Sequence, residues 1–572
     1  MEHPSAKEVP QFERGRIPVS WLAAALILLA GIGVRFWGVD QHFSHLDDVG
    51  VGQLIQEWKT RGISDLLIIP KNWTYAPLQF LITHFLITPA QTYREILFWG
   101  RLPSAFFGSA GLAGMLLFYA FYEGKDLRKG LLALAVLAFS WENIIHARQM
   151  HNYALGTACV VMMLVLWIRT VQKPEITLSH CLMDAVFLAV LIHGHYQVLF
   201  FMPGYYGSLF FFGWQRGDLK FRLGRNLAAG ASLFFLLILP ILMTFLWARL
   251  KVAGLNNWNE GPHKEFVLFF PAGLSFMGSI LHALRFYTVN FSIMFQAMTG
   301  FLPLSHPLNV PLGYYLYLTL FMFGSWRLAT TKNPERKALG IFFGGVGLVW
   351  IFLIYVHKLT LSPTRHNLLL LPLLAITIAE GLEFFLEKSD RTKLSTAIRK
   401  TVYWMLPVAI SLLFLTGFGK FLKERQDPFS ENHIFEILEK YDVDAVWTLE
   451  WTLPPGLMKS LQERYGYEGE GYVMDDVLVR ADSGYRTVAW LSHRSQWDTA
   501  NARILPALNK TLAVRNYFRA RGGKPPLPFI PGPLAGYHVI YEEVRPSPVE
   551  IEYAGKTKDG PNSFYFSILR KD

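Results

Sequence analysis

The chain has 572 residues, of which 52% are hydrophobic and 15% aromatic, while only 17% are charged. Soluble domains carry about a quarter charged residues, so this composition predicts a membrane protein. It excludes a disordered chain and a small secreted scaffold held by disulfides. The 54 Lys and Arg residues outnumber the 43 Asp and Glu residues and give a formal charge of +11. We expect membrane lipids as partners and no nucleic acid, because the basic residues follow the pattern of the membrane spans.

Apolar runs long enough to cross a bilayer, which takes about 20 residues, recur from residue 18 to residue 422. The first run lacks a small-residue cleavage site after it, so we expect it to remain as a span. A shorter run at 75–90 is expected to lie on the membrane surface or to re-enter it. The sequence therefore predicts about eleven spans, near 18–37, 102–122, 131–147, 153–169, 181–202, 203–214, 227–248, 311–327, 339–357, 367–386 and 402–422.

Basic connections alternate with longer, less basic ones along the chain. Lys and Arg mark the cytoplasmic side of membrane proteins, so the N-terminus is predicted to be cytoplasmic. The connections 38–100 and 249–310 and the C-terminal tail are then predicted to lie outside the cytoplasm. The basic set consists of Lys7, Arg14 and Arg16; Lys125, Arg128 and Lys129; Arg169 and Lys173; Arg216, Lys220, Arg222 and Arg225; Lys332, Arg336 and Lys337; and Lys388, Arg391, Lys393, Arg399 and Lys400.

The C-terminal part of the chain differs in character from the rest. A helical pattern at 431–441 precedes alternating runs typical of strands, with Pro- and Gly-rich loops between them. We predict a membrane domain over 1–424 and a soluble α/β or mostly β domain over 425–572. The strand-like runs are Asp444–Glu450, Tyr472–Arg480, Tyr485–Leu491, Tyr537–Glu543 and Phe564–Leu569.

Two adjacent carboxylates, Asp47 and Asp48, follow the first span in the external connection. At a membrane surface a carboxylate can act as a general base toward a hydroxyl group or as a ligand for a hard cation. The structural alternative is a helix N-cap, because a helical pattern follows Asp48. These two residues alone leave both interpretations open.

Short motifs around this pair resemble the N-terminal half of the GT-C glycosyltransferases, and more narrowly the branch of protein O-mannosyltransferases and the lipid A aminoarabinose transferase. The resemblance covers roughly residues 20–390 and depends on the order and spacing of the motifs. That family usually has Asp-Glu in the first loop where this chain has Asp47-Asp48, so either carboxylate is a candidate base. The motifs are Arg35-Phe-Trp-Gly, Leu46-Asp47-Asp48, Tyr75-Ala-Pro77-Leu, Gly100-Arg101-Leu-Pro103-Ser104, Ile145-His-Ala-Arg148-Gln-Met-His151-Asn-Tyr153 and Ser362-Pro363-Thr-Arg365-His366-Asn.

The resemblance implies a polytopic α-helical enzyme that moves a sugar from a polyprenyl-phosphate carrier to an acceptor hydroxyl on the non-cytoplasmic face. It implies that Asp47 is the base and that Asp48 supports it. The leaving lipid phosphate gains negative charge and needs fixed cations or donors. Basic residues at span ends also commonly anchor to lipid head groups, and this alternative stays open. The candidates at predicted outer ends are Arg101, Arg148, His151, Lys358, Arg365 and His366.

Four further residues are candidates for lining the substrate cavity: Tyr75, Tyr153, His193 and His195. The His193-Gly194-His195 sequence invites a metal interpretation. Positions two apart on a helix do not face the same way, so we favour a hydrogen-bonding role unless Gly194 breaks the helix. No cofactor is expected to be required, although Asp47 and Asp48 could hold a divalent cation.

The alternative function is a transporter or flippase of lipid-linked sugars, which would place ionisable residues near the middle of the bilayer. In this chain the charges within spans lie near the span ends, and polar residues gather in the external connections. The sugar is not identified by the sequence, and the acceptor could be a lipid, a glycan or a protein. The chain ends without an ER-retention signal, which favours a bacterial inner membrane.

Overall fold

The structure of the protein is a computed structural model. It describes residues 18–39, 77–89, 93–124, 126–217, 220–251, 268, 274–300, 315–356, 359, 361, 365–389, 396–424, 431–448, 477–478, 486–492, 537–546 and 563–571. Within these residues the chain forms two compact units, one of helices and one built on a sheet. Each unit is described by itself below.

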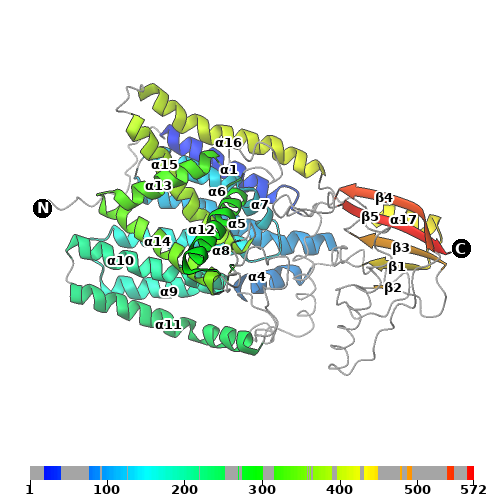
Figure 1. Ribbon diagram of the computed structural model, residues 1–572, viewed down its shortest axis with the longest axis horizontal. Helices are drawn as coiled ribbons and strands as arrows, with labels where there is room; N and C mark the ends of the chain where they lie inside the picture. Colours follow the sequence, from blue (N-terminus) through cyan, green and yellow to red (C-terminus); the bar gives the residue numbers. More distant parts are fainter. Residues whose placement is uncertain are drawn as a thin grey trace. The chain divides into compact units, whose positions relative to one another are not determined.

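The helical unit consists of apolar helices of very different lengths (Figure 1). Three short 3-10 segments, η1 (Leu127–Gly130), η2 (Tyr196–Phe201) and η5 (Arg365–Leu370), join some of them. The helices are α1 (Val19–Phe36), α4 (Pro77–Ile87), α5 (Tyr93–Tyr122), α6 (Leu131–Phe139), α7 (Trp141–His146), α8 (Tyr153–Val171), α9 (Leu178–Gly194), α10 (Met202–Arg216), α11 (Lys220–Lys251), α12 (Phe276–Thr299), α13 (Tyr317–Thr330), α14 (Pro334–Tyr355), α15 (Leu371–Ser389) and α16 (Thr396–Glu424).

Every apolar run predicted from the sequence overlaps one of these helices, which confirms a polytopic α-helical membrane protein. By length and hydropathy alone, six helices of the described part qualify as spans: Val19–Phe36, Phe98–Tyr122, Tyr153–Val171, Arg222–Pro240, Pro334–Tyr355 and Asn367–Glu387. The predicted count of eleven is therefore not established. The run at 75–90 forms only α4, whose 11 residues extend roughly 16 Å, too short to cross a bilayer core of about 30 Å.

The predicted single span at 131–147 is two helices in the structure. α6 ends at Phe139 and α7 starts after Ser140, whose hydroxyl oxygen accepts a hydrogen bond from the main-chain N–H of Asn143. The same hydroxyl donates to the carbonyl oxygen of Met298 at 2.7 Å. The break is therefore fixed both by a local cap and by a contact with the end of α12.

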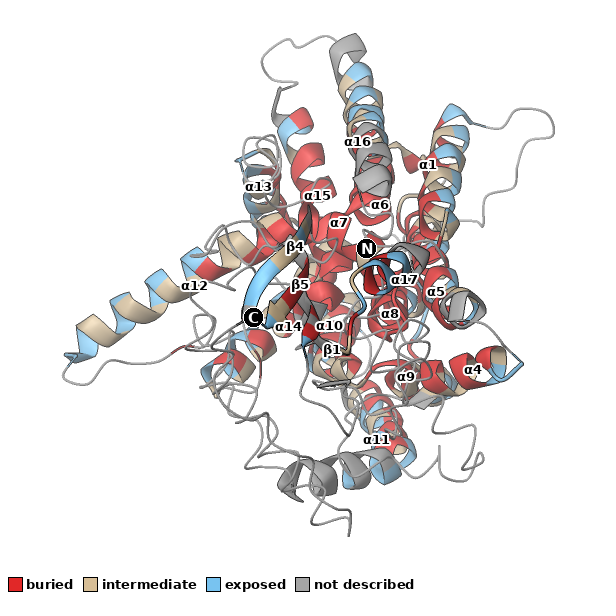
Figure 2. Ribbon diagram, turned by 90° about the vertical axis from the view of Figure 1, so that its right-hand side faces the viewer, coloured by how far each residue is buried: buried red, intermediate tan, exposed pale blue. Residues whose placement is uncertain are grey.

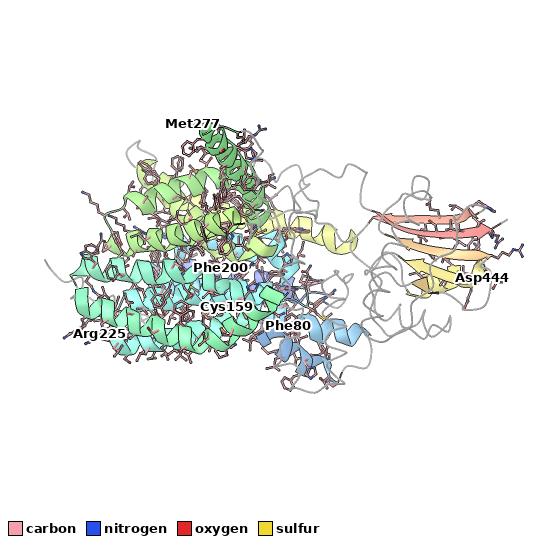
Figure 3. All side chains as sticks on the ribbon, turned by 60° about the horizontal axis from the view of Figure 1, so that its bottom comes forward. Phe80, Cys159, Phe200, Arg225, Met277 and Asp444 are labelled. Carbon is pink, nitrogen blue, oxygen red and sulfur yellow. The ribbon has the colours of Figure 1, made fainter. Side chains whose placement is uncertain are left out.

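The centre of the helical unit is formed by α6, α7 and α8, which are buried over most of their surface, whereas α1, α11, α12 and α16 expose their outer sides (Figure 2). All nine residues of α6 are buried. A helix that is apolar on every side requires neighbours on every side, and α6 packs against α1 and α15. Phe80 on α4 and Arg225 on α11 lie toward opposite ends of the unit, with Cys159 of α8 between them (Figure 3).

The main chains of helices α13 and α15 approach each other closely at two glycines. A methyl group on Gly324 would overlap the carbonyl oxygen of Thr377, and one on Gly381 would overlap the carbonyl oxygen of Leu320. Small residues at helix crossings in membranes allow such contact between backbones. Glycine is therefore required at both positions by the packing of the two helices.

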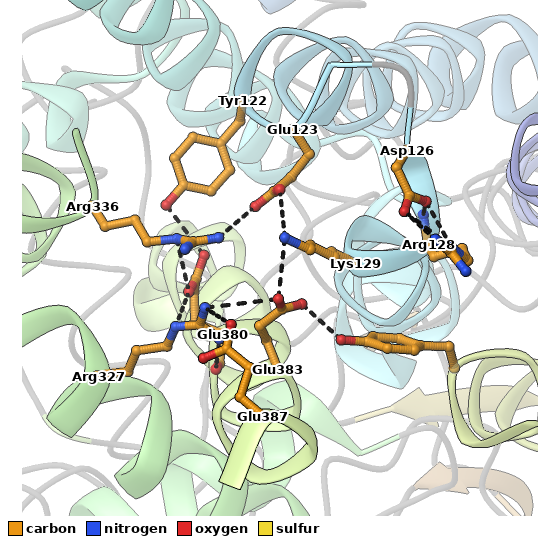
Figure 4. Close-up of polar contacts among 11 residues, drawn as sticks. Tyr122, Glu123, Asp126, Arg128, Lys129, Arg327, Arg336, Glu380, Glu383 and Glu387 are labelled. Atoms are coloured by element: carbon orange, nitrogen blue, oxygen red, sulfur yellow. Dashed lines mark hydrogen bonds and ion pairs between the residues drawn. The ribbon is translucent and has the colours of Figure 1, made fainter. Parts of the chain in front are cut away.

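Next to this crossing lies a set of charged residues, here called the ion cluster, in which Glu380, Glu383 and Arg327 are buried (Figure 4). It joins the ends of α5, α13, α14 and α15, which all point to the predicted cytoplasmic side. Arg327 Nε lies 3.2 Å from Glu380 Oε2, and Arg336 Nη2 lies 3.0 Å from Glu123 Oε1. Lys129 Nζ bridges Glu123 and Glu383 at 3.0 and 3.1 Å. The cluster consists of Glu123, Lys129, Arg327, Arg336, Glu380, Glu383 and Glu387.

The sheet unit has the mixed helix and strand structure predicted for the C-terminal part of the chain. Its sheet has the order β2-β1-β3-β5-β4, in which β1 and β3 are parallel and the other neighbours antiparallel. Tyr441, which follows the helix, packs against Tyr541 of β4, and Phe566 and Ile568 of β5 are fully buried. The elements are α17 (Glu431–Lys440), β1 (Ala445–Thr448), β2 (Val477–Leu478), β3 (Thr487–Ser492), β4 (Tyr537–Pro546) and β5 (Ser563–Lys571).

The ion cluster is expected to contribute strongly to stability. Arg327→Met leaves Glu380 and Glu383 buried without this cation, which should cost about 3–5 kcal/mol. Arg222→Met is the matched control, because its pair with Glu175 is 3.4 Å long and about half exposed, so its loss should cost less than about 1 kcal/mol. Thermal unfolding of the purified protein in detergent measures both. Equal midpoints for the two variants would contradict a stabilising role of the cluster.

Candidate functional site

The structure describes some of the predicted site residues and not others. Asp47, Asp48, Tyr75 and Lys358 lie outside the described residues. Arg365 and His366 form the first turn of η5, and their side chains are outside the described part. The other predicted residues, Arg101, Arg148, His151, Tyr153, His193 and His195, belong to α5, α8, α9 and the segments beside them. The roles predicted for all of these residues stay predictions.

The C-terminal end of α1 is held by a fully buried guanidinium group. Arg35 is 0% exposed. It donates to the carbonyl oxygen of Gly31 at 2.7 Å and to those of Ala138 and Leu137 at 3.0 and 3.2 Å. These carbonyls belong to the last turns of α1 and α6, where the helix dipoles favour a positive charge. Among the described residues no carboxylate pairs with Arg35, so helix carbonyls solvate this cation.

Two predicted phosphate-binding residues, Arg101 and Arg148, also contact the C-terminal end of α1 and the residues directly after it, here called the exit of α1. Arg148 donates to the carbonyl oxygens of Val34 and Gly38 at 2.5 and 3.0 Å. Arg101 donates to that of Val39 at 2.8 Å. Both side chains are buried rather than extended toward the surface. Two guanidinium groups, from α5 and the 147–152 turn, therefore bind the residues that lead into the first external connection, and Arg35 lies on α1 directly before them.

A chain of hydrogen bonds ties the short helix α4 to the same turn. Gln79 Nε2 donates to Ser104 Oγ at 2.5 Å, and the Ser104 hydroxyl donates to the carbonyl oxygen of His151 at 2.9 Å. All three residues are buried. The polar side of α4 therefore faces α5 and the 147–152 turn, as expected for a helix that covers the end of the bundle.

Aromatic and imidazole rings form a packed group next to the turn. The rings of His151 and Tyr153 are stacked with centroids 4.2 Å apart and an angle of 7° between them. Tyr153 also packs against His146 and His195, with centroids 5.5 and 5.6 Å apart. Phe80 meets His151 edge to face at 6.5 Å. The structure thus brings together the predicted residues His151, Tyr153 and His195.

His193 and His195 are separated by the end of a helix. α9 ends at Gly194, and His195 is extended, with its ring next to Gly156, where a methyl group would lie 2.8 Å from the imidazole. His193 stays half-buried in the last turn of α9. In the described part of the chain no three His, Cys, Asp or Glu residues are grouped as metal ligands. The cation site left open by the sequence is the Asp47-Asp48 pair.

Several residues of this region have no role in the sequence-based hypothesis. Arg35 and Ser104 occur in the quoted motifs, but nothing in the sequence indicates that Arg35 joins two helix ends. Gln79 has no local signal. Glu142 and His146 do have a local signal in the sequence, because residues four apart on a helix lie on the same face.

Removal of the Arg35 guanidinium is expected to destabilise the helical unit. Arg35→Met leaves the carbonyl oxygen of Ala138 without this donor, and an unsatisfied buried acceptor costs about 1–3 kcal/mol. The carbonyl oxygen of Leu137 keeps the hydrogen bond from the Asn143 side chain at 2.8 Å. Arg35→Lys keeps the charge but cannot form the same fork of bonds, so an intermediate loss is expected. Thermal unfolding measures the order wild type, Lys variant, Met variant. An Arg35→Met protein as stable as wild type would refute the importance of this contact.

No protein-family model and no curated protein matches the chain. Its fold is similar to the crystal structure of ArnT from Cupriavidus metallidurans bound to undecaprenyl phosphate, with a TM-score of 0.50 and 12% sequence identity over 85% of this chain and 94% of that chain. The apo structure of the same protein gives a TM-score of 0.45, 11% identity and the same coverage. ArnT is a lipid A aminoarabinose transferase of the GT-C type. The chain therefore has the GT-C type of fold that its motifs predict.

Proposed function

We propose that the protein is a glycosyltransferase that moves a sugar from a polyprenyl-phosphate donor to an acceptor hydroxyl on the non-cytoplasmic face of the membrane. The observation that carries this proposal is the contact of two buried guanidinium groups, those of Arg101 and Arg148, with the C-terminal end of α1. Arginine suits the multidentate recognition of phosphate oxygens. The similarity to an ArnT structure that holds undecaprenyl phosphate supports the same class of donor.

In the proposed reaction, Asp47 removes the proton from the acceptor hydroxyl while its oxygen attacks the anomeric carbon of the sugar. The bond between that carbon and the phosphate oxygen breaks, and the phosphate leaves with the electron pair. A single displacement of this kind inverts the anomeric configuration. Arg101, Arg148, Arg365, His151, His366 and Lys358 are the proposed stabilisers of the leaving charge.

The main-chain contacts of Arg101 and Arg148 give them a second part in this mechanism. Both hold Val34, Gly38 or Val39, directly before the connection that carries Asp47 and Asp48. A fixed start of this connection reduces the range of positions that the base can occupy, which is how enzymes gain from orientation. His195, His193, Tyr153 and Tyr75 are the proposed lining of the substrate cavity.

The acceptor belongs to the lipid, glycan or protein class, and the proposed location is a bacterial inner membrane with the N-terminus in the cytoplasm. In this orientation the ion cluster lies on the cytoplasmic side and the residues of α4 and the 147–152 turn lie outside. The C-terminal domain, residues 425–572, is proposed to lie on the same side as the acceptor.

The proposed function is tested by sugar transfer from a panel of radiolabelled polyprenyl-phosphate sugars. Asp47→Asn should lower the rate about 10²- to 10⁴-fold, the usual contribution of a general base, and Asp48→Asn shows which carboxylate acts. Asp126→Asn is the matched control. Asp126 lies in the opposite connection, where hydrogen bonds from Arg128 hold the pKa of its carboxyl below the ordinary value. The Asp126→Asn variant should transfer sugar at the rate of wild type.

Transfer of no donor by the wild type would refute the glycosyltransferase and leave the flippase as the alternative to test. Equal rates for wild type and both Asp variants would refute the assignment of the base.

Chelation tests the metal requirement. We expect transfer to continue in EDTA, since the proposed base and the basic residues act without a divalent metal ion. Loss of transfer in EDTA, with recovery on addition of a divalent ion, would instead assign Asp47 and Asp48 as metal ligands.

A further inference from the structure

The helix beside the candidate site carries a carboxylate and an imidazole that have no part in the proposed reaction. Glu142 and His146 are four residues apart on α7 and therefore lie on the same face. Glu142 Oε2 is 3.4 Å from His146 Nε2. His146 is 0% exposed and Glu142 is 8% exposed. The pair is thus enclosed by protein, where its interaction is stronger than at a wet surface.

The other nitrogen of the same ring contacts the turn that follows. His146 Nδ1 lies 2.7 Å from Oε1 of Gln149, which is also buried. Gln149 is next to Arg148 and two residues before His151. The hydrogen bond at Nδ1 orients the plane of the imidazole, while Nε2 faces Glu142 at 3.4 Å without a hydrogen bond. His146 therefore connects the carboxylate on α7 to the turn of 147–152.

The imidazole of His146 also touches the ring group. His146 packs against Tyr153 at 5.5 Å, and Tyr153 stacks on His151 at 4.2 Å. A rotation of the His146 ring would disturb both the turn and the stack. Its position therefore affects two of the residues that the proposed function uses.

α7 itself is anchored to a distant part of the chain. Its cap, Ser140, donates to the carbonyl oxygen of Met298, and the main-chain N–H of Trp141 donates to the carbonyl oxygen of Gly300 at 2.8 Å. The Glu142 and His146 side chains therefore extend from a helix that is held at its start. Because the start of α7 is held, the two side chains can in turn hold the 147–152 turn in one position.

We propose that Glu142 and His146 are positioning residues that hold the 147–152 turn and the Tyr153–His151 stack in the geometry needed for transfer. The proposal rests on the proposed function, because it is through Arg148 and His151 that the pair acts on the reaction. A displacement of about 1 Å of reacting or binding groups can lower a rate up to about 100-fold. The pair is thus expected to influence turnover without touching the substrate.

The test compares His146→Phe and Glu142→Gln with wild type. Phenylalanine keeps an aromatic ring against Tyr153 but removes both polar contacts, and glutamine keeps the shape of Glu142 without its charge. Asp184→Asn is the matched control. It alters a buried carboxylate on α9 that accepts hydrogen bonds from Thr170 and Tyr205 at 2.9 and 2.7 Å and has no part in the proposed site.

Three quantities are measured on the purified full-length proteins: kcat per folded molecule with the donor KM, the thermal midpoint, and hydrogen exchange of residues 147–155. We expect His146→Phe and Glu142→Gln to lower kcat about 10-fold, to change the donor KM less, and to speed exchange in this segment. His146→Gln, which can still form a hydrogen bond, should recover part of kcat. Asp184→Asn leaves the Glu142–His146 pair intact, so its kcat and its exchange over 147–155 should equal those of wild type.

A kcat equal to wild type in both variants, or the same fall in kcat for Asp184→Asn, would overturn the proposal. So would unchanged exchange in 147–155. If the wild type transfers no sugar but the variants still exchange faster, the proposed function is refuted. The pair would then be shown only to hold the turn in place. The two failures are thus distinguishable.

Discussion

The contact of Arg35 with the ends of α1 and α6 is the constraint on which the outer end of the helical unit depends. A buried cation is costly unless polar groups surround it, and the carbonyl oxygens of two helix ends supply them. The main chain can present the Leu137 and Ala138 oxygens to Arg35 because α6 stops before Ser140. The break, the short helix α7 and the turn after it follow from the same arrangement.

The buried cations at the two ends of the helical unit have different partners. In the ion cluster, Arg327, Arg336 and Lys129 face carboxylates, so opposite charges largely cancel. Around the exit of α1, Arg35 is solvated by carbonyl dipoles, which stabilise a cation without neutralising it. Cancelled charge suits a structural role, whereas retained positive charge suits attraction of an anionic group. This contrast agrees with chemistry at the end that carries α4 and the 147–152 turn.

The sequence predicted the helices and the mixed C-terminal domain because both depend on local patterns of apolar and turn residues. It did not predict the break at Ser140, because the apolar residues on both sides of Ser140, Glu142 and Asn143 were taken as one span and the partner Met298 is far along the chain. The contacts of Arg35 and the pairing of Arg327 with Glu380 were hidden for the same reason. The ring group was only partly predictable: the motif contains His151 and Tyr153, but the approach of His195 depends on Gly156.

The crossing at Gly324 and Gly381 limits how the bundle can move. Since the backbones of α13 and α15 touch there, neither helix can slide along the other or turn about its own axis without a collision of main-chain atoms. The two glycines therefore set the axial register of the two helices. η5 leads directly into α15, so this register also sets the position of the Arg365 backbone relative to α13.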